Sequence, residues 1–218
     1  MIVERIDFEN RAALATALAR KTAQVLSRAI SKSGSAVLAV SGGQTPALFF
    51  EHLSHTQISW DKVTVTLVDE RQVTEDDPRS NARLVRHILL KNQASKAGFV
   101  PLYGNPAAEN TGGFTACILG MGNDGHTASY FPGGDTLAQA IDPHTDKSII
   151  AISAPGSGEP RLTFTLPRLT AATFLALHIE GSEKSKTLDK ALSGDDVLEM
   201  PVRAVLKSKT PLHVYLCP

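Results

Sequence analysis

The chain has 218 residues, of which 42% are hydrophobic, and its 22 Lys and Arg balance its 22 Asp and Glu. This length and composition fit one domain, residues 1–218, whose core needs no disulfides, and the zero net charge argues against nucleic acid or an anionic membrane as a partner. No apolar run reaches the roughly 20 residues of a membrane span and the N-terminus is charged, so a cytoplasmic protein is expected.

The first half of the chain alternates between predicted helices and strands. Apolar side chains at helical spacing predict an amphipathic helix over residues 10–32. A continuous apolar strand follows over 35–43, and then a helix in TPALFFEHLS that begins at Thr45. A second strand is predicted over 62–71, followed by a helix from about Ser80.

The second half continues the alternation. Strands are predicted over 115–120, 147–153, 173–181 and 212–217, and a helix begins at SEKSKTLDKAL between the last two. Near-continuous Val, Ile and Leu strands separated by helices predict an α/β fold, with a mostly parallel, Rossmann-like sheet and helices on both faces. In such sheets ligands bind at the carboxyl ends of the strands. Glycines and charged residues follow four strands, in SGGQTP, DER, GMGNDGH and EGSEK, so we expect these stretches to meet.

SGGQTP has the composition of a phosphate cradle. Gly42 and Gly43 let the backbone approach a ligand closely, and Thr45 before a proline is a favourable N-cap, so that amide N–H groups and a helix dipole face an anion. An ordinary strand-to-helix turn is the alternative. The stretch is not a Walker loop. Ser41 is expected to contact substrate rather than to be a nucleophile, because G-x-S-x-G is missing.

Charged residues near other strand and helix starts are candidate ligands. Asp69, Glu70 and Arg71 end the strand over 62–71 and either begin a solvated loop or face a ligand, where Arg71 can bind phosphate or carboxylate through a bidentate contact.

Lys184, Arg161 and Arg168 are further candidates. Lys184 follows EGSE at the start of a helix, and the two arginines lie in EPRLTFTLPRLTAA. Considered alone, each is more often a surface charge than a ligand, and their significance depends on whether they converge with the other stretches.

The stretch GMGNDG, residues 120–125, satisfies the G-x-G-x-x-G pattern of a dinucleotide-binding turn. That turn needs a long helix directly after it and an acid at the end of the next strand. Pro132 and Gly133 end the following helix early, and no acid follows the strand over 147–153. We therefore expect no nucleotide cofactor.

His126 follows the same glycine loop and is a candidate general base. Asp124 can set its tautomer or contact substrate, and Gly122 lets a substrate lie close to the backbone. The alternative is a histidine that only caps a short helix, HTASYF. No metal site is expected, because no further ligands occur at metal-binding spacing, and Cys117 and Cys217 are predicted to be small core or edge residues.

Taken together, SGGQTP, LVDERQV with SNARLVRHILL, LGMGNDGHTASYFPG, PRLTFTLPRLTAA and EGSEKSKTL resemble the glucosamine-6-phosphate isomerase/6-phosphogluconolactonase family over nearly the whole chain. The continuation H-T-A-S-x-F-P-G is similar to the lactonase branch. The resemblance implies hydrolysis of 6-phospho-D-glucono-1,5-lactone to 6-phosphogluconate in the pentose phosphate pathway, without metal or organic cofactor. A monomer or small homo-oligomer is expected. It also implies a fold shared with glucosamine-6-phosphate deaminases and ribose-5-phosphate isomerases.

The resemblance also implies catalytic and substrate-binding roles for individual residues. It assigns the catalytic histidine to His126, with Asp124 as its acidic neighbour. It also implies substrate contacts from, or close to, a set of charged residues: Asp69, Glu70, Arg71 and Lys184.

Two departures from the family pattern produce expectations of their own. Thr173 stands where members often carry an arginine, so that a phosphate contact is either missing or supplied by Arg161 or Arg168. The segment before Phe114 lacks a fuller helix, and one covering helix is therefore expected to be short or absent. Two other functions stay open at this point: a glucosamine-6-phosphate deaminase or isomerase, and a sugar-phosphate sensor that binds without turnover.

Overall fold

A seven-stranded sheet in which all neighbouring strands are parallel forms the centre of the computed structural model, which describes residues 3–218. The prediction of a mostly parallel α/β fold is confirmed, and the central strands are almost wholly buried because both faces of the sheet are covered. The strands in spatial order are β1 (Val3–Asp7), β10 (Leu212–Cys217), β9 (Phe174–Glu180), β6 (Ala116–Gly120), β2 (Ala36–Val40), β3 (Val63–Leu67) and β5 (Gly98–Val100).

The two edge strands were not predicted. β1 is charged and mostly exposed, and β5 has only three residues, so neither shows the apolar run that marks the interior strands.

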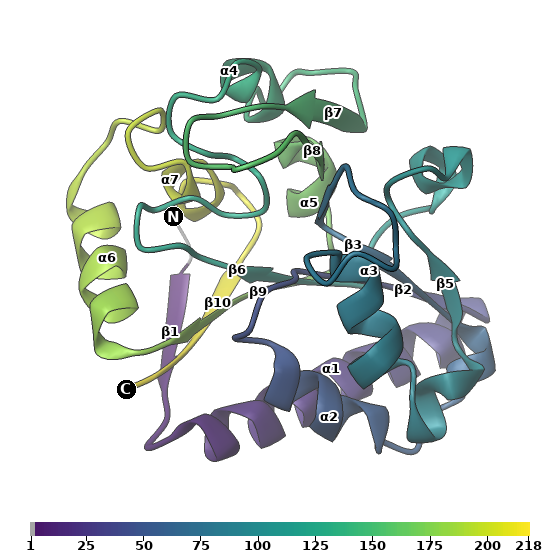
Figure 1. Cartoon of the computed structure of the whole chain (residues 1–218). Coiled ribbons are helices and arrows are strands. Elements are labelled where there is room, and N and C mark those ends of the chain that lie inside the picture. Colours follow the sequence, from purple (N-terminus) through teal and green to yellow (C-terminus); the bar gives the residue numbers. More distant parts are fainter. Residues whose placement is uncertain (1–2) are drawn as a thin grey trace.

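Helices cover both faces of this sheet. Figure 1 shows α1 and α2 below the central sheet, and α4, α5 and α7 above it. The α-helices are α1 (Arg11–Ser33), α2 (Ala47–Ser54), α3 (Asn81–Leu84), α4 (Leu137–Ala140), α5 (Leu166–Thr170), α6 (Ser182–Ser193) and α7 (Val202–Leu206). Short 3₁₀ segments span Trp60–Lys62, Asn92–Lys96 and Pro106–Asn110, and a π-helical turn spans Val85–Leu89.

Local capping explains where the longest helix begins and ends. The Asn10 side chain accepts a hydrogen bond from the Ala13 N–H (2.9 Å), and Gly34 closes the helix in the left-handed region (φ 81°). The predicted helix over 10–32 is confirmed. The α2 helix begins at Ala47, one residue later than a Thr45 N-cap predicts. Its N-cap is Pro46 and no side chain caps it, so the prediction of Thr45 as N-cap was wrong.

A second, antiparallel sheet was not predicted. It consists of β4 (Asp69–Arg71), β8 (Arg161–Phe164) and β7 (Ile149–Ile152). The single strand expected over 62–71 is therefore wrong, because the chain leaves the parallel sheet at Val68. The Val68 N–H donates to the Val40 carbonyl of β2 (2.9 Å), whereas its carbonyl accepts from the Phe164 N–H of β8 (3.0 Å).

The stretch HTASYF, residues 126–131, is not helical, contrary to the prediction. The Thr127 hydroxyl donates to the Gly120 carbonyl (2.7 Å), and the Tyr130 hydroxyl donates to the Phe164 carbonyl (2.6 Å). These bonds hold an extended turn with a bridge between Thr127 and Tyr130. His126 consequently caps no helix.

The remaining predictions concern covering segments. The helix expected from Ser80 is found as α3 followed by the π-helical turn, with the Ser80 hydroxyl accepting from the Arg83 N–H (3.2 Å). Between β5 and Phe114 the only helical segment is the 3₁₀ segment Pro106–Asn110, in agreement with a shortened covering helix.

Within residues 3–218, none of the helices has the length and apolar character needed to cross a membrane.

Candidate active site

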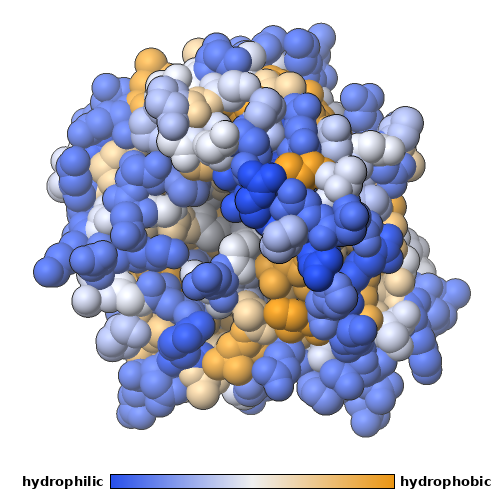
Figure 2. Space-filling view, in the orientation of Figure 1, coloured by the Kyte–Doolittle hydropathy of each residue, from blue (hydrophilic) through white to orange (hydrophobic). Residues whose placement is uncertain are grey.

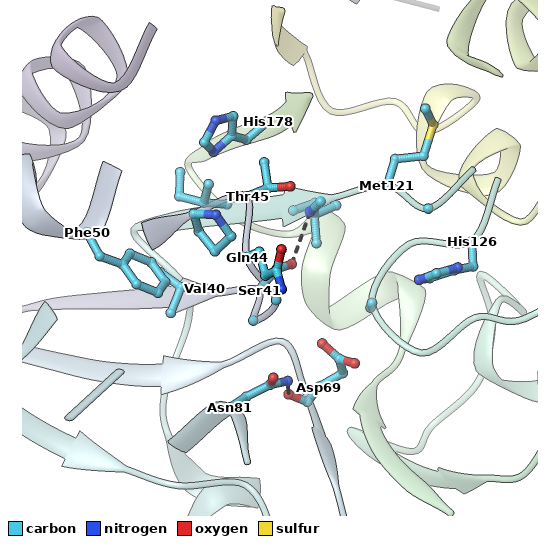
Figure 3. A pocket seen from close by; sticks show the side chains of 18 of the residues that line it. Val40, Ser41, Gln44, Thr45, Phe50, Asp69, Asn81, Met121, His126 and His178 are labelled. Carbon is cyan, nitrogen blue, oxygen red and sulfur yellow. Dashed lines mark hydrogen bonds between the residues drawn. The ribbon is translucent and has the colours of Figure 1, made fainter. Parts of the chain in front are cut away.

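A pocket of about 220 Å³ lies at the carboxyl ends of the central strands. It is lined by all four stretches that were expected to meet there: Ser41 to Thr45, Asp69 with Arg71, Gly120 to Gly122 with His126, and Lys184. Figure 2 shows a hollow on this face among mostly hydrophilic side chains, and Figure 3 shows Ser41, Asp69 and His126 facing the same space. Segments distant in sequence meet there because parallel strands end on one edge.

His126 and Asp124 form a hydrogen-bonded pair. His126 Nδ1 lies 2.5 Å from Asp124 Oδ1, which also accepts from the His126 backbone N–H (3.1 Å). Burial raises the pKa of Asp124, but the hydrogen bonds and charge of His126 outweigh this and lower it below its ordinary value. An ionised Asp124 favours the tautomer with hydrogen on Nδ1. Among residues 3–218 no hydrogen bond uses His126 Nε2, which is left as the basic nitrogen.

The backbone and an aromatic ring fix the orientation of this pair. The Gly122 N–H donates to the His126 carbonyl (2.9 Å), and the His126 ring packs on Phe131 with centroids 4.2 Å apart. A Cβ on Gly122 would lie 2.2 Å from His126 Cε1 and 2.6 Å from Asp124 Oδ1. Only glycine leaves room for the pair at this position.

The SGGQTP loop is tied to the neighbouring loop and is close to β4. The Ser41 hydroxyl accepts from the Gly120 N–H (3.0 Å). A Cβ on Gly42 would lie 1.9 Å from the Asn81 side chain, so this loop packs directly on the start of α3. No base among residues 3–218 is hydrogen-bonded to Ser41, in keeping with a contact residue rather than a nucleophile.

Lys184 reaches this loop from the other side. Its ammonium group donates to the Thr45 hydroxyl (3.3 Å). Gly43, two residues before Thr45 in the loop, has a φ of 88°. Burial lowers the pKa of Lys184, an effect that the charge of Glu180 partly opposes. The loop and Lys184 together present N–H donors and a cation to the pocket.

Asp69 and two arginines line the opposite wall. The Asp69 carboxylate accepts from the Ser129 hydroxyl (2.6 Å) and lies 3.9 Å from Arg161 Nη1. Arg161 is 9% exposed, and its guanidinium group lies over the Phe131 ring, 5.2 Å from the centroid. Burial lowers the pKa of Arg161, against the nearby charge of Asp69. Arg71 is the second arginine of this wall.

Three predicted site residues do not line the pocket. Asp124 lies behind His126 and is connected to the pocket through that histidine. Glu70 is buried and accepts hydrogen bonds at the start of α3: from the N–H groups of Arg71 (2.7 Å), Asn81 (2.9 Å) and Ala82 (2.7 Å), and from the Ser80 hydroxyl (3.1 Å). Burial raises the pKa of Glu70, against the effect of these N–H groups. These four hydrogen bonds occupy both oxygens of the Glu70 carboxylate, so no acceptor site is left for a ligand.

Arg168 is the third predicted site residue outside the pocket lining. Its guanidinium group lies over Phe114 (4.8 Å) and Phe164 (5.8 Å) and donates to the Gly112 carbonyl. Of the two arginines considered as replacements for the one missing at Thr173, the structure brings only Arg161 to the pocket.

Three residues around the pocket were not identified from sequence. His178 is 2% exposed, lines the pocket and contacts Glu180 through Nε2 (2.9 Å), and Glu180 pairs with Arg11 (2.5 Å). A histidine within the apolar run TFLALHIEG was a usable signal. Ser129 lies in the stretch H-T-A-S-x-F-P-G, which indicated the loop but not this serine in particular, and nothing in the pattern around Glu159 indicates a site residue.

Metal ligands were also considered. No group of three or more His, Cys, Asp or Glu side chains within residues 3–218 is arranged to hold a metal ion. Cys117 and Cys217 are buried and unpaired in β6 and β10, which confirms them as core residues.

Comparisons with known proteins identify the family of the chain. The family model described as glucosamine-6-phosphate isomerases/6-phosphogluconolactonase matches residues 9–214. A protein named 6-phosphogluconolactonase from Rhizobium meliloti (strain 1021) is 50% identical over 97% of this chain and 97% of its own length. One from Pseudomonas putida is 39% identical over 94% of this chain and 89% of its own.

Solved structures show the same arrangement of elements. The crystal structure of a 6-phosphogluconolactonase from Shewanella baltica OS155 has a TM-score of 0.94 at 37% identity, covering 99% of this chain and 98% of that chain. A monomeric glucosamine-6-phosphate deaminase shares the fold, with a TM-score of 0.78 at 18% identity over 98% of this chain and 97% of its own. The chain belongs to the glucosamine-6-phosphate isomerase/6-phosphogluconolactonase family.

Proposed function

We propose that this protein hydrolyses 6-phospho-D-glucono-1,5-lactone to 6-phospho-D-gluconate in the pentose phosphate pathway, with His126 as the base that activates water. The single observation that carries the proposal is the Asp124–His126 pair at 2.5 Å, whose basic nitrogen is free beside a pocket lined by cations. The relatives named 6-phosphogluconolactonase support the choice of substrate.

The reaction needs one proton carrier. His126 Nε2 takes a proton from water as the water oxygen bonds to the lactone C1, and the C1 carbonyl electrons form a tetrahedral oxyanion. The oxyanion collapses, the bond from C1 to the ring oxygen breaks, and the imidazolium returns its proton to that oxygen. Asp124 stabilises the imidazolium in between and keeps its orientation.

The pocket cations orient the substrate. We place the phosphate among the backbone amides of Gly42 and Gly43, Lys184 and the two arginines of the opposite wall. Binding energy from this non-reacting group then holds C1 near His126. The proposed reaction uses only groups of the protein chain and requires neither a metal nor an organic cofactor.

The cellular setting forms part of the proposal. We assign the activity to a single α/β domain of the cytoplasm, acting as a monomer or small homo-oligomer. Cell fractionation and sedimentation of the purified chain test these two points.

A coupled assay tests the reaction. Glucose-6-phosphate dehydrogenase generates the lactone, and 6-phosphogluconate formation is followed with and without the protein and with EDTA. We expect acceleration that survives EDTA. His126→Asn should lower kcat by roughly 10²–10⁴-fold with little change in KM, since only the base is lost.

His144→Asn is the matched control, because His144 lies exposed in a loop outside the pocket. Near-normal turnover by the His126→Asn variant would contradict the role of His126. Ammonia release from glucosamine 6-phosphate without lactone hydrolysis would instead indicate a deaminase, and binding of 6-phosphogluconate without turnover would indicate a sensor.

A further inference from the structure

One carboxylate behind the pocket contacts arginines from three segments. Glu159 lies in the loop between β7 and β8, and its side chain is 18% exposed. Glu159 Oε1 lies 2.9 Å from Arg71 Nε and 3.7 Å from Arg161 Nη2, whereas Oε2 accepts from Arg79. Arg71 and Arg161 line the pocket, but Glu159 does not. Glu159 is therefore a partner of the pocket cations rather than a wall of the pocket.

The two pocket arginines are direct neighbours in the small sheet. Arg71 of β4 and Arg161 of β8 are paired in the antiparallel register. Like charges directly opposite each other on adjacent strands repel and destabilise the pairing. The charge of Arg71 contributes to the lowered pKa of Arg161, after burial as the main cause, whereas Glu159 acts in the opposite direction. A carboxylate that contacts both arginines offsets this repulsion.

The N–H donors of Arg71 are divided between contacts inside the protein and the pocket. Nε faces Glu159, and Nη1 donates to the Arg79 carbonyl (2.6 Å) and to Asn81 Oδ1 (3.0 Å). No hydrogen bond within residues 3–218 uses Nη2. The guanidinium group is thus held along two of its nitrogens and keeps the third for a ligand.

Arg161 is held in a similar way. Its Nη2 donates to the Ser157 carbonyl (2.8 Å) in the same loop as Glu159, and its Nη1 faces Asp69 at 3.9 Å. Its buried Nε has no hydrogen-bond partner among the described residues. Both arginines therefore contact the 153–160 loop, and among residues 3–218 neither Arg71 Nη2 nor Arg161 Nη1 is used in a hydrogen bond.

We propose that Glu159 is a positioning residue that holds Arg71 and Arg161 side by side so that both can bind the phosphate group of the substrate. The inference rests on the proposed function, because it takes the phosphate monoester of that substrate as the ligand of the two arginines. Without Glu159 the guanidinium groups separate, and the pocket loses its paired donors while keeping His126 unchanged.

Steady-state kinetics and phosphate binding of Glu159→Ala and Glu159→Gln test this proposal. We expect Glu159→Ala to raise both KM for the lactone and Kd for inorganic phosphate roughly tenfold, with kcat within about twofold of the wild-type value. Glu159→Gln keeps an oxygen that can accept from an arginine N–H, so it should rescue part of the loss, to about a threefold increase.

Asp77→Asn is the matched control, because Asp77 pairs with Arg79 but contacts neither pocket arginine. It should leave KM and the Kd for phosphate unchanged. If the glutamate only diminished the positive charge of the pocket, both Glu159 variants would bind phosphate equally tightly or more tightly than the wild type, and the proposal would be wrong. Unchanged constants would also overturn it.

Two further readouts keep the outcomes separate. Thermal unfolding checks that each variant is folded. If the Glu159→Ala variant does not fold, the proposal is tested by whether Glu159→Gln raises KM and Kd. Lactone hydrolysis by the wild-type protein tests the proposed function separately. If the wild type hydrolyses the lactone and the Glu159 variants are unaffected, only the positioning role is refuted. If the wild type does not hydrolyse the lactone, the proposed function is refuted, and phosphate binding can still be measured.

Discussion

The two sheets differ in how they contribute to the pocket. The parallel sheet brings the SGGQTP loop, the His126 loop and Lys184 to one edge through strand ends. The antiparallel sheet instead pairs Asp69–Arg71 with Arg161–Thr163, segments about 90 residues apart, and thereby supplies the acidic and cationic wall. The first contribution follows from local pattern and strand direction, and the second from a long-range pairing.

This difference suggests a division of labour. In the proposed mechanism the loops of the parallel sheet supply the base together with the Gly42–Gly43 amides and Lys184, whereas the small sheet supplies the two arginines of the phosphate site. Changes in the His126 loop should therefore lower kcat, and changes in the small sheet should affect stability or KM.

The largest effect is expected in the His126 loop. Gly122→Ala places a methyl group 2.2 Å from the His126 ring, which must move away from Asp124. We expect kcat to fall about 10²-fold or more, because the base loses its position. Gly113→Ala is the control, since nothing lies within 4 Å of its Cβ and its φ is not positive. A kcat for the Gly122→Ala variant close to wild type would show that the loop tolerates displacement of the pair.

A second, smaller effect is expected where the small sheet meets α3. Glu70→Gln replaces an oxygen that accepts backbone N–H groups by an amide donor, so buried donors lose their partner. We expect the free energy of unfolding in urea to decrease by about 2 kcal/mol. Glu75→Gln, at a half-exposed ion pair with Arg86, should change it by less than about 0.5 kcal/mol. Equal stability of the two variants would contradict the structural role of Glu70.

The smallest effect separates the two arginines of the PRLTFTLPRLTAA stretch. Arg161→Met should raise KM for the lactone roughly tenfold, because it removes a cation from the pocket. Arg168→Met should leave KM unchanged and cost only about 1 kcal/mol of stability, because it removes a cation from two aromatic faces. A raised KM for the Arg168→Met variant alone would reverse the assignment.

Much of the fold was predictable because strong local patterns marked it. The apolar runs of β2, β6, β9 and β10 and the amphipathic pattern of α1 each report burial directly. The failures lie where a tertiary contact decides the local structure. HTASYF is held as a turn by bonds to Gly120 and Phe164, and the strand over 62–71 divides at Val68 because two different sheets compete for its backbone groups.

The site shows the same distinction at the level of single residues. Sequence alone determined the loop that carries Asp124 and His126, since two residues so close in the chain must also be close in space. Only the tertiary structure decided which charges reach the pocket: Asp69 lines it while its neighbour Glu70 caps α3, and Arg161 lines it while Arg168 stacks on aromatic rings. The reason is physical, because alternation along a strand and pairing across 90 residues set these directions, and no local pattern records the partner strand.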